Sequence, residues 1–465
     1  MWGGSLSIWQ PPFCDEGLLR PAFPIGYRMG AGFVRLCPGD KFTGIKFPSG
    51  QNTNKNTENP MQRSGRPFEK GRKGLPERNG REKGMDCKLD LSKEYGIVLE
   101  GGGAKGSYQI GAWKALREAG IKIKGIAGTS VGALNGALIC MDALEQAEAL
   151  WENIRYSQVM DIDDMVMESI RKKDLKTISL TDVFAEVKKV LKAGGFDIAP
   201  LRNLIGETVD EEKIRNSDRE LFVSAISLSD LKPLIIDMKE VGEGEMGDML
   251  LASAYFPAFK SEKLGGKRYT DGAAANNVPV DVLADRGYQE IICIRIYGLG
   301  LDTERFFSVP EGVNVYHIAP RQSLGGILEF NPKKARRNMS LGYLDSQRLL
   351  YGLGGRRYYL YAPESETYYF DKMMSEIRFL TDYPDPELEP YRPGPNDGCR
   401  VYTERFFPAI ARKEGLKEDW DYRDLYLLIL EKLAGKLRIS RFKVYTVEEL
   451  LLKIRQKAGS LDSGF

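Results

Sequence analysis

Runs of apolar residues separated by polar ones predict strands alternating with helices between about residues 95 and 350. Residues 95–100 form a short apolar run, residues 107–119 have helical spacing and stop at Gly120, and a second apolar run follows. This order predicts an α/β fold, with a mostly parallel sheet between helices. Further strands are expected at 220–228, 233–238, 290–298 and 313–319, and a helix at about 332–350.

The two ends of the chain depart from this pattern. Residues 1–84 are rich in Gly, Pro, Asn and Arg without a sustained period, which predicts a disordered basic tail, and Met85 is an alternative biological start. A change in composition near Tyr351 predicts that a large domain at 85–351 is followed by a small helical extension at 352–465. The last helix of that extension is expected to open with a capping box at Thr446 and Glu449.

Composition and charge narrow the possible functions. The chain has 465 residues, of which 42% are hydrophobic and 28% charged, as in globular proteins. Outside the tail, 53 Lys and Arg stand against 58 Asp and Glu, a mildly acidic balance that argues against nucleic-acid binding. The six cysteines form no CxxC pair and have no zinc-like spacing. No run reaches the roughly 20 apolar residues of a membrane span, so a cytoplasmic protein is expected.

A glycine-rich loop separates the first strand from the first helix. The loop contains Gly101, Gly102, Gly103 and Gly106. Of these, Gly101, Gly103 and Gly106 fit the GxGxxG pattern of dinucleotide sites, but such a site also needs an acidic residue at the end of the second strand. That strand has none, and no phosphate-binding P-loop can be aligned. A tight turn alone explains one glycine and explains three in a row poorly. An oxyanion therefore becomes the preferred ligand.

The second strand ends in GTSVG, from Gly128 to Gly132, which is the pattern of a nucleophile elbow with Ser130 at its centre. Ser130 could also be an ordinary helix N-cap. Strand-to-helix turns of neighbouring parallel strands lie at the same edge of a sheet, so the amides of the glycine loop and Ser130 are expected to face one reacting atom. The loop is therefore interpreted as an oxyanion hole.

A nucleophilic serine needs a base, and two residues are candidates. His317 is the only histidine, and Ser130, Asp271 and His317 follow the α/β-hydrolase order, but His317 lies inside an apolar run that is more typical of a packed strand residue. Asp271 precedes Gly272 and small residues, which is also the pattern of a simple turn. With the elbow and the glycine loop present, a Ser130–Asp271 dyad is favoured. Burial would strengthen an aspartate of ordinary pKa, about 3.9.

These motifs together resemble the patatin-like phospholipase family over about residues 93–285. The resemblance rests on GGGAKG at 101–106, GTSVG, DGAAANN from Asp271 and ASAYFPAF at 252–259. It implies a three-layer α/β/α fold in which Ser130 is the nucleophile and Asp271 the general base. It also implies that the amides of Gly101, Gly102 and Gly103 are the oxyanion donors, supported by Lys105, Gly106, Gly128, Gly132 and Gly272. Family members often have Arg in place of Lys105, and DGG in place of DGA.

The function implied by the resemblance is hydrolysis of fatty-acyl esters of lipids, of the phospholipase A or lysophospholipase type, without a metal or another cofactor. A lipid substrate suggests contact with a membrane surface, for which the helices expected at about 155–200 are candidates. The equal alternative is that these helices pack on the sheet as ordinary helices. Two alternatives stay open. One is a non-catalytic protein that binds a partner through residues 352–465, and the other is a hydrolase of soluble esters that uses His317.

Overall fold

The computed structural model describes residues 85–161, 164, 195–302, 304, 308–376, 390–391, 393–394 and 397–462. The expected disorder of residues 1–84 and the helix expected at Thr181 lie outside the described residues, as does most of the segment at 155–200. The strands and helices that carry the sequence motifs are all described.

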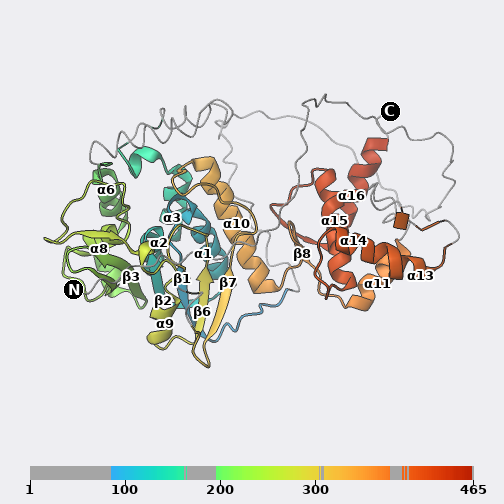
Figure 1. The fold of residues 1–465 in the computed structure, drawn as a ribbon, viewed down its shortest axis with the longest axis horizontal. Coiled ribbons are helices and arrows are strands. Elements are labelled where there is room, and N and C mark those ends of the chain that lie inside the picture. The colour runs from blue at the N-terminus through green and yellow to red at the C-terminus, as the bar shows by residue number, and fades with distance from the viewer. Residues whose placement is uncertain are drawn as a thin grey trace, which may run out of the picture. The chain divides into compact units, whose positions relative to one another are not determined.

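A seven-stranded sheet forms the centre of the motif-bearing region (Figure 1). Its strands are β1 (Glu94–Leu99), β2 (Lys122–Thr129), β3 (Glu220–Ser227), β4 (Lys232–Asp237), β5 (Tyr269–Asp271), β6 (Glu290–Ile294) and β7 (Asn314–Ile318). They are ordered β4-β3-β2-β1-β6-β7, and β5 also pairs with β3. The neighbouring pairs β3–β2, β2–β1, β1–β6 and β6–β7 are parallel, whereas β4 and β5 run antiparallel to β3. The expected mostly parallel sheet is confirmed.

Helices cover both faces of the sheet, which gives the expected three layers. One face packs against α1 (Ser107–Ala119), α2 (Val131–Cys140), α3 (Leu144–Asn153) and α10 (Pro332–Tyr351), and the other against α9 (Val280–Asp285). The first layer is tight where α1 meets α10. A Cβ atom at Gly111 would overlap the Met339 carbonyl, and one at Gly342 would overlap the Tyr108 carbonyl. These two glycines let the helix backbones approach closely.

Shorter helices complete this region and a second group of helices follows it. The shorter helices are α6 (Ala199–Thr208), α7 (Glu211–Asn216) and α8 (Met246–Ser253). The second group consists of α11 (Glu366–Ser375), α13 (Cys399–Val401), α14 (Phe407–Lys413), α15 (Tyr422–Lys436) and α16 (Val447–Asp462), with the short paired strands β8 (Tyr359–Tyr361) and β9 (Val444–Thr446). It has a hydrophobic cluster of its own, between residues 358 and 454. The Thr446 hydroxyl accepts the Glu449 amide at 3.1 Å, which confirms the N-cap half of the expected capping box, whereas the Glu449 carboxylate accepts Lys443 Nζ at 2.6 Å.

The short strands β8 and β9 were not expected in the helical extension, and two strands of the seven-stranded sheet also differ from the sequence-based expectation. β5 was not expected, because three residues are too few for a periodic pattern. β6 ends at Ile294, although the apolar run predicts a strand to residue 298. The backbone amides of residues 296–298 donate to the buried carboxylate of Glu100 and not to a neighbouring strand. A tertiary contact thus ends this strand early.

Candidate active site

Ser130 occupies a strained turn between β2 and α2. Its backbone has φ 55° and ψ −123°, in the left-handed region of φ that non-glycine residues rarely adopt. A Cβ atom at Gly128 would lie 2.5 Å from the Gly132 carbonyl carbon, and one at Gly132 would overlap the Leu99 carbonyl oxygen. Both flanking glycines are therefore required by the turn. The Ser130 amide donates to Ser253 Oγ at 2.9 Å, which helps to hold this conformation.

The sheet register brings Asp271 to Ser130. β2 pairs with the first part of β3, up to Ser224, and β5 pairs with the next three residues of β3. Because β5 runs antiparallel to β3, its last residue, Asp271, meets the end of β2. Ser130 Oγ donates a hydrogen bond of 2.7 Å to Asp271 Oδ2. Residues 141 positions apart in the sequence thus form the contact that a catalytic dyad requires.

The surroundings of Asp271 alter its basicity. Its side chain is buried, and burial raises its pKa because a carboxylate loses solvation there. The hydrogen bonds from Ser130 and from the Ala273 amide, the latter 2.8 Å from Oδ1, act in the opposite direction without cancelling the rise. The Ala273 bond also fixes the orientation of the carboxylate. Asp271 is therefore a stronger base than an exposed aspartate.

The glycine loop offers two backbone donors beside Ser130. Gly102 and Gly103 line the same pocket as Ser130, and within the described residues neither amide has a hydrogen-bond acceptor. The Gly101 amide instead donates to the Asn277 carbonyl at 3.3 Å, which differs from the expectation that all three amides are open. Gly103 has φ 55°, and a Cβ atom there would overlap the Ile327 carbonyl oxygen. Only glycine fits this position without strain.

Glu100 is a site residue that the sequence reasoning missed. Its carboxylate is 2% exposed and accepts the amides of residues 296–298 at 2.7 to 3.0 Å, together with Arg295 Nε at 3.0 Å. These bonds fix the 296–298 segment against the glycine loop, where a Cβ atom at Gly298 would overlap the Gly101 carbonyl. The only sequence signal is an acidic residue at the end of an apolar strand, directly before the glycines.

The remaining motif residues act on the shape of the loop. Lys105 Nζ donates to the Tyr297 carbonyl, and burial lowers the pKa of Lys105. A Cβ atom at Gly106 would lie 2.5 Å from Val131 Cγ2, which would push the glycine loop away from the elbow. At Gly272 a Cβ atom would overlap the Ser224 carbonyl oxygen. All three residues therefore support the backbone around the dyad.

An apolar pocket of about 340 Å³ opens beside the dyad. Ser130, Asp271 and the two glycines with open amides lie in its wall. The rest of the wall is mainly hydrophobic and comes from α2, α3, α6 and the loops around residues 256 and 328, and it includes Leu138, Trp151, Leu201, Ile205, Phe259 and Phe330. Leu299 and Leu328 line the pocket and are also 68% and 39% exposed. The reacting atoms therefore face a cavity suited to an apolar chain.

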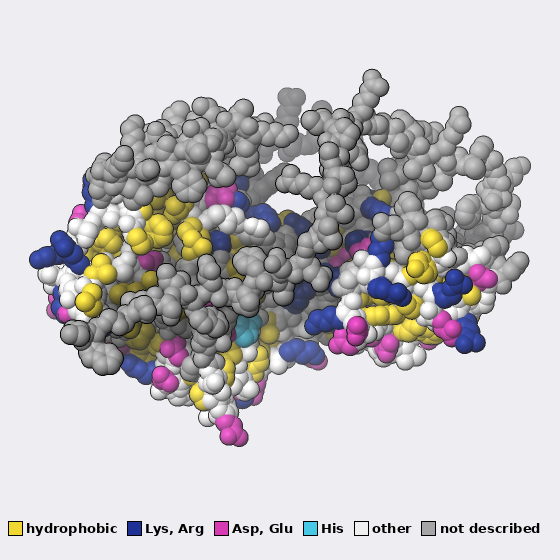
Figure 2. Space-filling view, in the orientation of Figure 1, with side chains coloured by type: hydrophobic (Ala, Val, Ile, Leu, Met, Phe, Trp, Pro, Cys, Tyr) yellow, Lys and Arg dark blue, Asp and Glu magenta, His cyan; other side chains and the backbone are white. Residues whose placement is uncertain are grey.

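His317 does not join this group. It lies on β7, which β1 and β6 separate from β2, and its Nε2 pairs with Glu304. Its side chain is 47% exposed, and the histidine colour is visible on the face drawn in Figure 2. Of the two candidate bases, the structure brings only Asp271 to Ser130.

Comparison with known proteins agrees with this geometry. Residues 97–284 match the sequence profile of a family described as Patatin-like phospholipase. They form a patatin-like phospholipase domain. The match contains the glycine loop, the elbow and Asp271, and the patatin-like domain has the mostly parallel sheet with flanking helices described above.

Relatives of the patatin-like domain include much longer proteins. Neuropathy target esterase sws of Drosophila melanogaster is 28% identical over 209 residues, which are 43% of this chain and 13% of that protein. Lysophospholipase nte1 of Aspergillus terreus is 59% identical over 51 residues, 11% of this chain and 3% of that protein. The chain thus spans a small part of these relatives. The crystal structure of VipD from Legionella pneumophila is 14% identical, with a TM-score of 0.35 over 79% of this chain and 88% of that one.

Replacing Gly103 with alanine tests the glycine loop. The added methyl group would meet the Ile327 carbonyl and disfavour the backbone conformation, so the amides of residues 102 and 103 should move. We expect hydrolysis of a soluble ester to slow by roughly 10²- to 10³-fold, as for loss of an oxyanion donor. The matched control is Gly206→Ala in α6, where a Cβ atom has no neighbour within 4 Å. Equal rates for both variants would exclude this role of the loop.

Proposed function

We propose that the patatin-like domain hydrolyses fatty-acyl esters of lipids with a Ser130–Asp271 dyad. The observation that carries the proposal is the 2.7 Å hydrogen bond from Ser130 Oγ to a buried carboxylate, in the wall of an apolar pocket. Nucleophile, base and acyl-chain cavity are then present within one site. No metal or other cofactor has a part in this reaction.

The reaction is a two-step acyl transfer. Asp271 takes the hydroxyl proton while Ser130 Oγ attacks the ester carbonyl, and the amides of Gly102 and Gly103 donate to the oxyanion. The intermediate collapses, the ester bond to the alcohol breaks, and Asp271 returns the proton to the leaving oxygen. Asp271 then removes a proton from water, which attacks the acyl-serine and releases the fatty acid. The proton passes back to Ser130 Oγ, which restores the starting state.

A lipid substrate is favoured by the pocket and by the exposed leucines beside it. Leu299 and Leu328 present apolar surface next to the dyad, where a hydrolase of small soluble esters needs none. The names of the relatives, a lysophospholipase and an esterase, agree with a substrate of the phospholipase A or lysophospholipase type. We further propose a cytoplasmic protein that contacts membrane surfaces peripherally. Among the described helices, none has the length and apolarity to cross a bilayer.

The test is covalent labelling by a fluorophosphonate serine probe, combined with fatty-acid release from phospholipid and lysophospholipid vesicles and from a short soluble ester. We expect wild-type protein to be labelled and to release fatty acid, and Ser130→Ala to do neither. Ser340→Ala, which changes a serine bonded only to its own helix, serves as the matched control and should behave as wild type.

Other outcomes would redirect the proposal. Folded wild-type protein that takes no label would instead favour a binding protein acting through residues 352–465. Labelling with release from the soluble ester alone would reject the lipid substrate and retain the dyad. Activity that disappears in His317→Ala and persists in Asp271→Asn would show that the base is His317 and not Asp271.

A further inference from the structure

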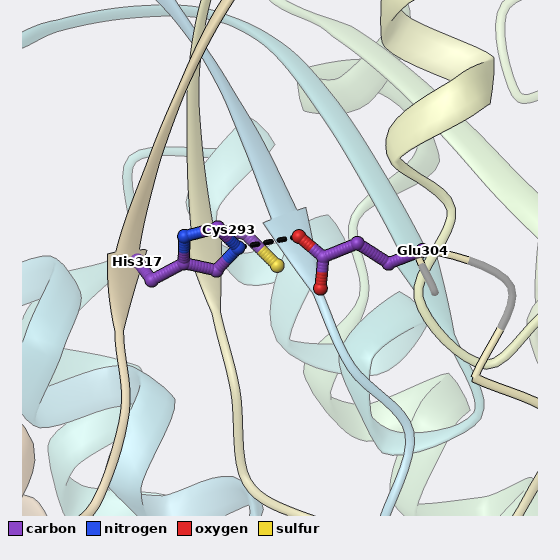
Figure 3. A group of neighbouring side chains, drawn as sticks. All are labelled: Cys293, Glu304 and His317. Atoms are coloured by element: carbon purple, nitrogen blue, oxygen red, sulfur yellow. Dashed lines mark hydrogen bonds and ion pairs between the residues drawn. The ribbon is translucent and has the colours of Figure 1, made fainter. Parts of the chain in front are cut away.

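We infer that Cys293, Glu304 and His317 form a binding site for a divalent transition-metal ion such as Zn²⁺. Among the described residues, these three side chains place a sulfur, a carboxylate oxygen and an imidazole nitrogen within 4.8 Å of one another (Figure 3). The site lies on β6 and β7, with β1 between it and the strand that carries Ser130. None of the three residues belongs to the proposed Ser130–Asp271 dyad.

Sheet pairing explains why these residues meet. Cys293 and His317 are register partners on the parallel strands β6 and β7, so their side chains emerge side by side on one face of the sheet. Glu304 reaches the same place from the connection that follows β6. This arrangement is tertiary, which is why the linear spacing of the cysteines showed no zinc pattern. Tetrahedral zinc holds its ligand atoms about 3.3 to 3.6 Å apart, so small side-chain rotations would close the site.

The donors match the chemistry of a borderline metal. Thiolate, imidazole and carboxylate are the three side-chain ligands that zinc takes in proteins. Cys293 is a free cysteine and is fully buried. The half-exposed His317 leaves the fourth position open to water.

The second layer of contacts also suits a cation. Arg295 donates to the other oxygen of Glu304, which orients that carboxylate as the outer partners of metal ligands do. Arg295 is also paired with Glu100 and Asp302. Three carboxylates thus surround one guanidinium, so these four side chains have a formal net charge of −2 (three negative charges and one positive). A divalent ion would balance this charge.

The test uses Co²⁺ as a spectroscopic probe of the full-length protein, previously treated with a chelator. Bound cobalt should produce a near-ultraviolet thiolate-to-metal charge-transfer band that saturates at one ion per chain. Cys293→Ala should abolish this band. His317→Ala should weaken cobalt binding by at least about tenfold, and Zn²⁺ should displace the cobalt.

Matched variants separate this site from other thiols. Cys140→Ala removes another buried free cysteine, and it should leave the band unchanged. Because Cys293→Ala changes a core residue, circular dichroism must show a folded protein; if it is unfolded, the half-exposed His317 variant decides. Absence of the band in wild-type protein would mean that His317 and Glu304 form only a hydrogen bond. A band that survives in His317→Ala would place the metal elsewhere, and either result rejects the site.

Discussion

Asp271→Asn should reduce ester hydrolysis by a factor on the order of 10⁴, comparable to disabling a group of a serine-protease triad. Asparagine keeps the shape of the side chain and can still accept the Ala273 amide, but it cannot take the proton from Ser130. The measurement is kcat/KM for a short soluble ester, so that vesicle binding does not affect the result. Asp285→Asn, at an exposed position of α9, is the matched control and should keep wild-type activity.

The raised pKa of Asp271 adds an expected pH dependence. The base works only when it is ionised, so activity should decline as pH falls through the pKa of Asp271, which lies above the ordinary value of about 3.9. The residual activity of Asp271→Asn should not show this decline. The stability effect has the opposite sense. A carboxyl group whose pKa is higher in the folded state stabilises the fold below its unfolded pKa, and this contribution is lost as pH rises through the folded pKa.

At neutral pH the ionised, buried Asp271 therefore opposes folding, and asparagine removes that cost. Asp271→Asn should be at least as stable as wild type at pH 7, by thermal unfolding, despite its loss of activity. An inactive variant that unfolds well below the wild-type temperature would show that Asp271 holds the structure together, which would contradict its assignment as a base. Activity near the wild-type level in a folded variant would remove the dyad altogether.

The nucleophile and the glycine loop could be predicted from the sequence because their geometry is local. Gly128, Ser130 and Gly132 lie within five residues, and the packing that forbids a side chain at each glycine arises from a strand-to-helix turn. Asp271 was harder to place, since its position depends on β5, a strand of three residues. The motif identified the residue, but the register with β3 explains why its carboxylate reaches the serine.

Contacts between distant segments could not be predicted. Glu100 and the amides that it accepts are separated by 196 to 198 residues, and nothing in either segment alone indicates the other. The same contact made the strand prediction at 290–298 too long, because an apolar run does not reveal that its last amides turn toward a carboxylate. The bond from the Gly101 amide to the Asn277 carbonyl could not be predicted for the same reason, because the two residues are 176 positions apart.

Glu100→Gln should therefore have a large effect on stability. Glu100 Oε2 accepts the Ile296 and Tyr297 amides, and Oε1 accepts the Gly298 amide. In either orientation, the glutamine amide group would point its hydrogens at backbone donors that have lost their acceptor. The substitution also removes one partner of Arg295, whose side chain is mostly buried. We expect the free energy of unfolding to fall by about 3–5 kcal/mol, the range for breaking a buried ion pair.

Glu100→Gln should also slow ester hydrolysis, because it disturbs the glycine loop. Residues 296–298 press against Gly101 and Gly102, so releasing them allows the two open amides to move away from the oxyanion position. In variant protein that is still folded at low temperature, hydrolysis of a soluble ester should slow by about 10²-fold. Denaturant unfolding and ester kinetics measure the two effects, with Glu94→Gln at the exposed start of β1 as the control. Lost stability with full activity would show that Glu100 supports the fold but not the oxyanion hole.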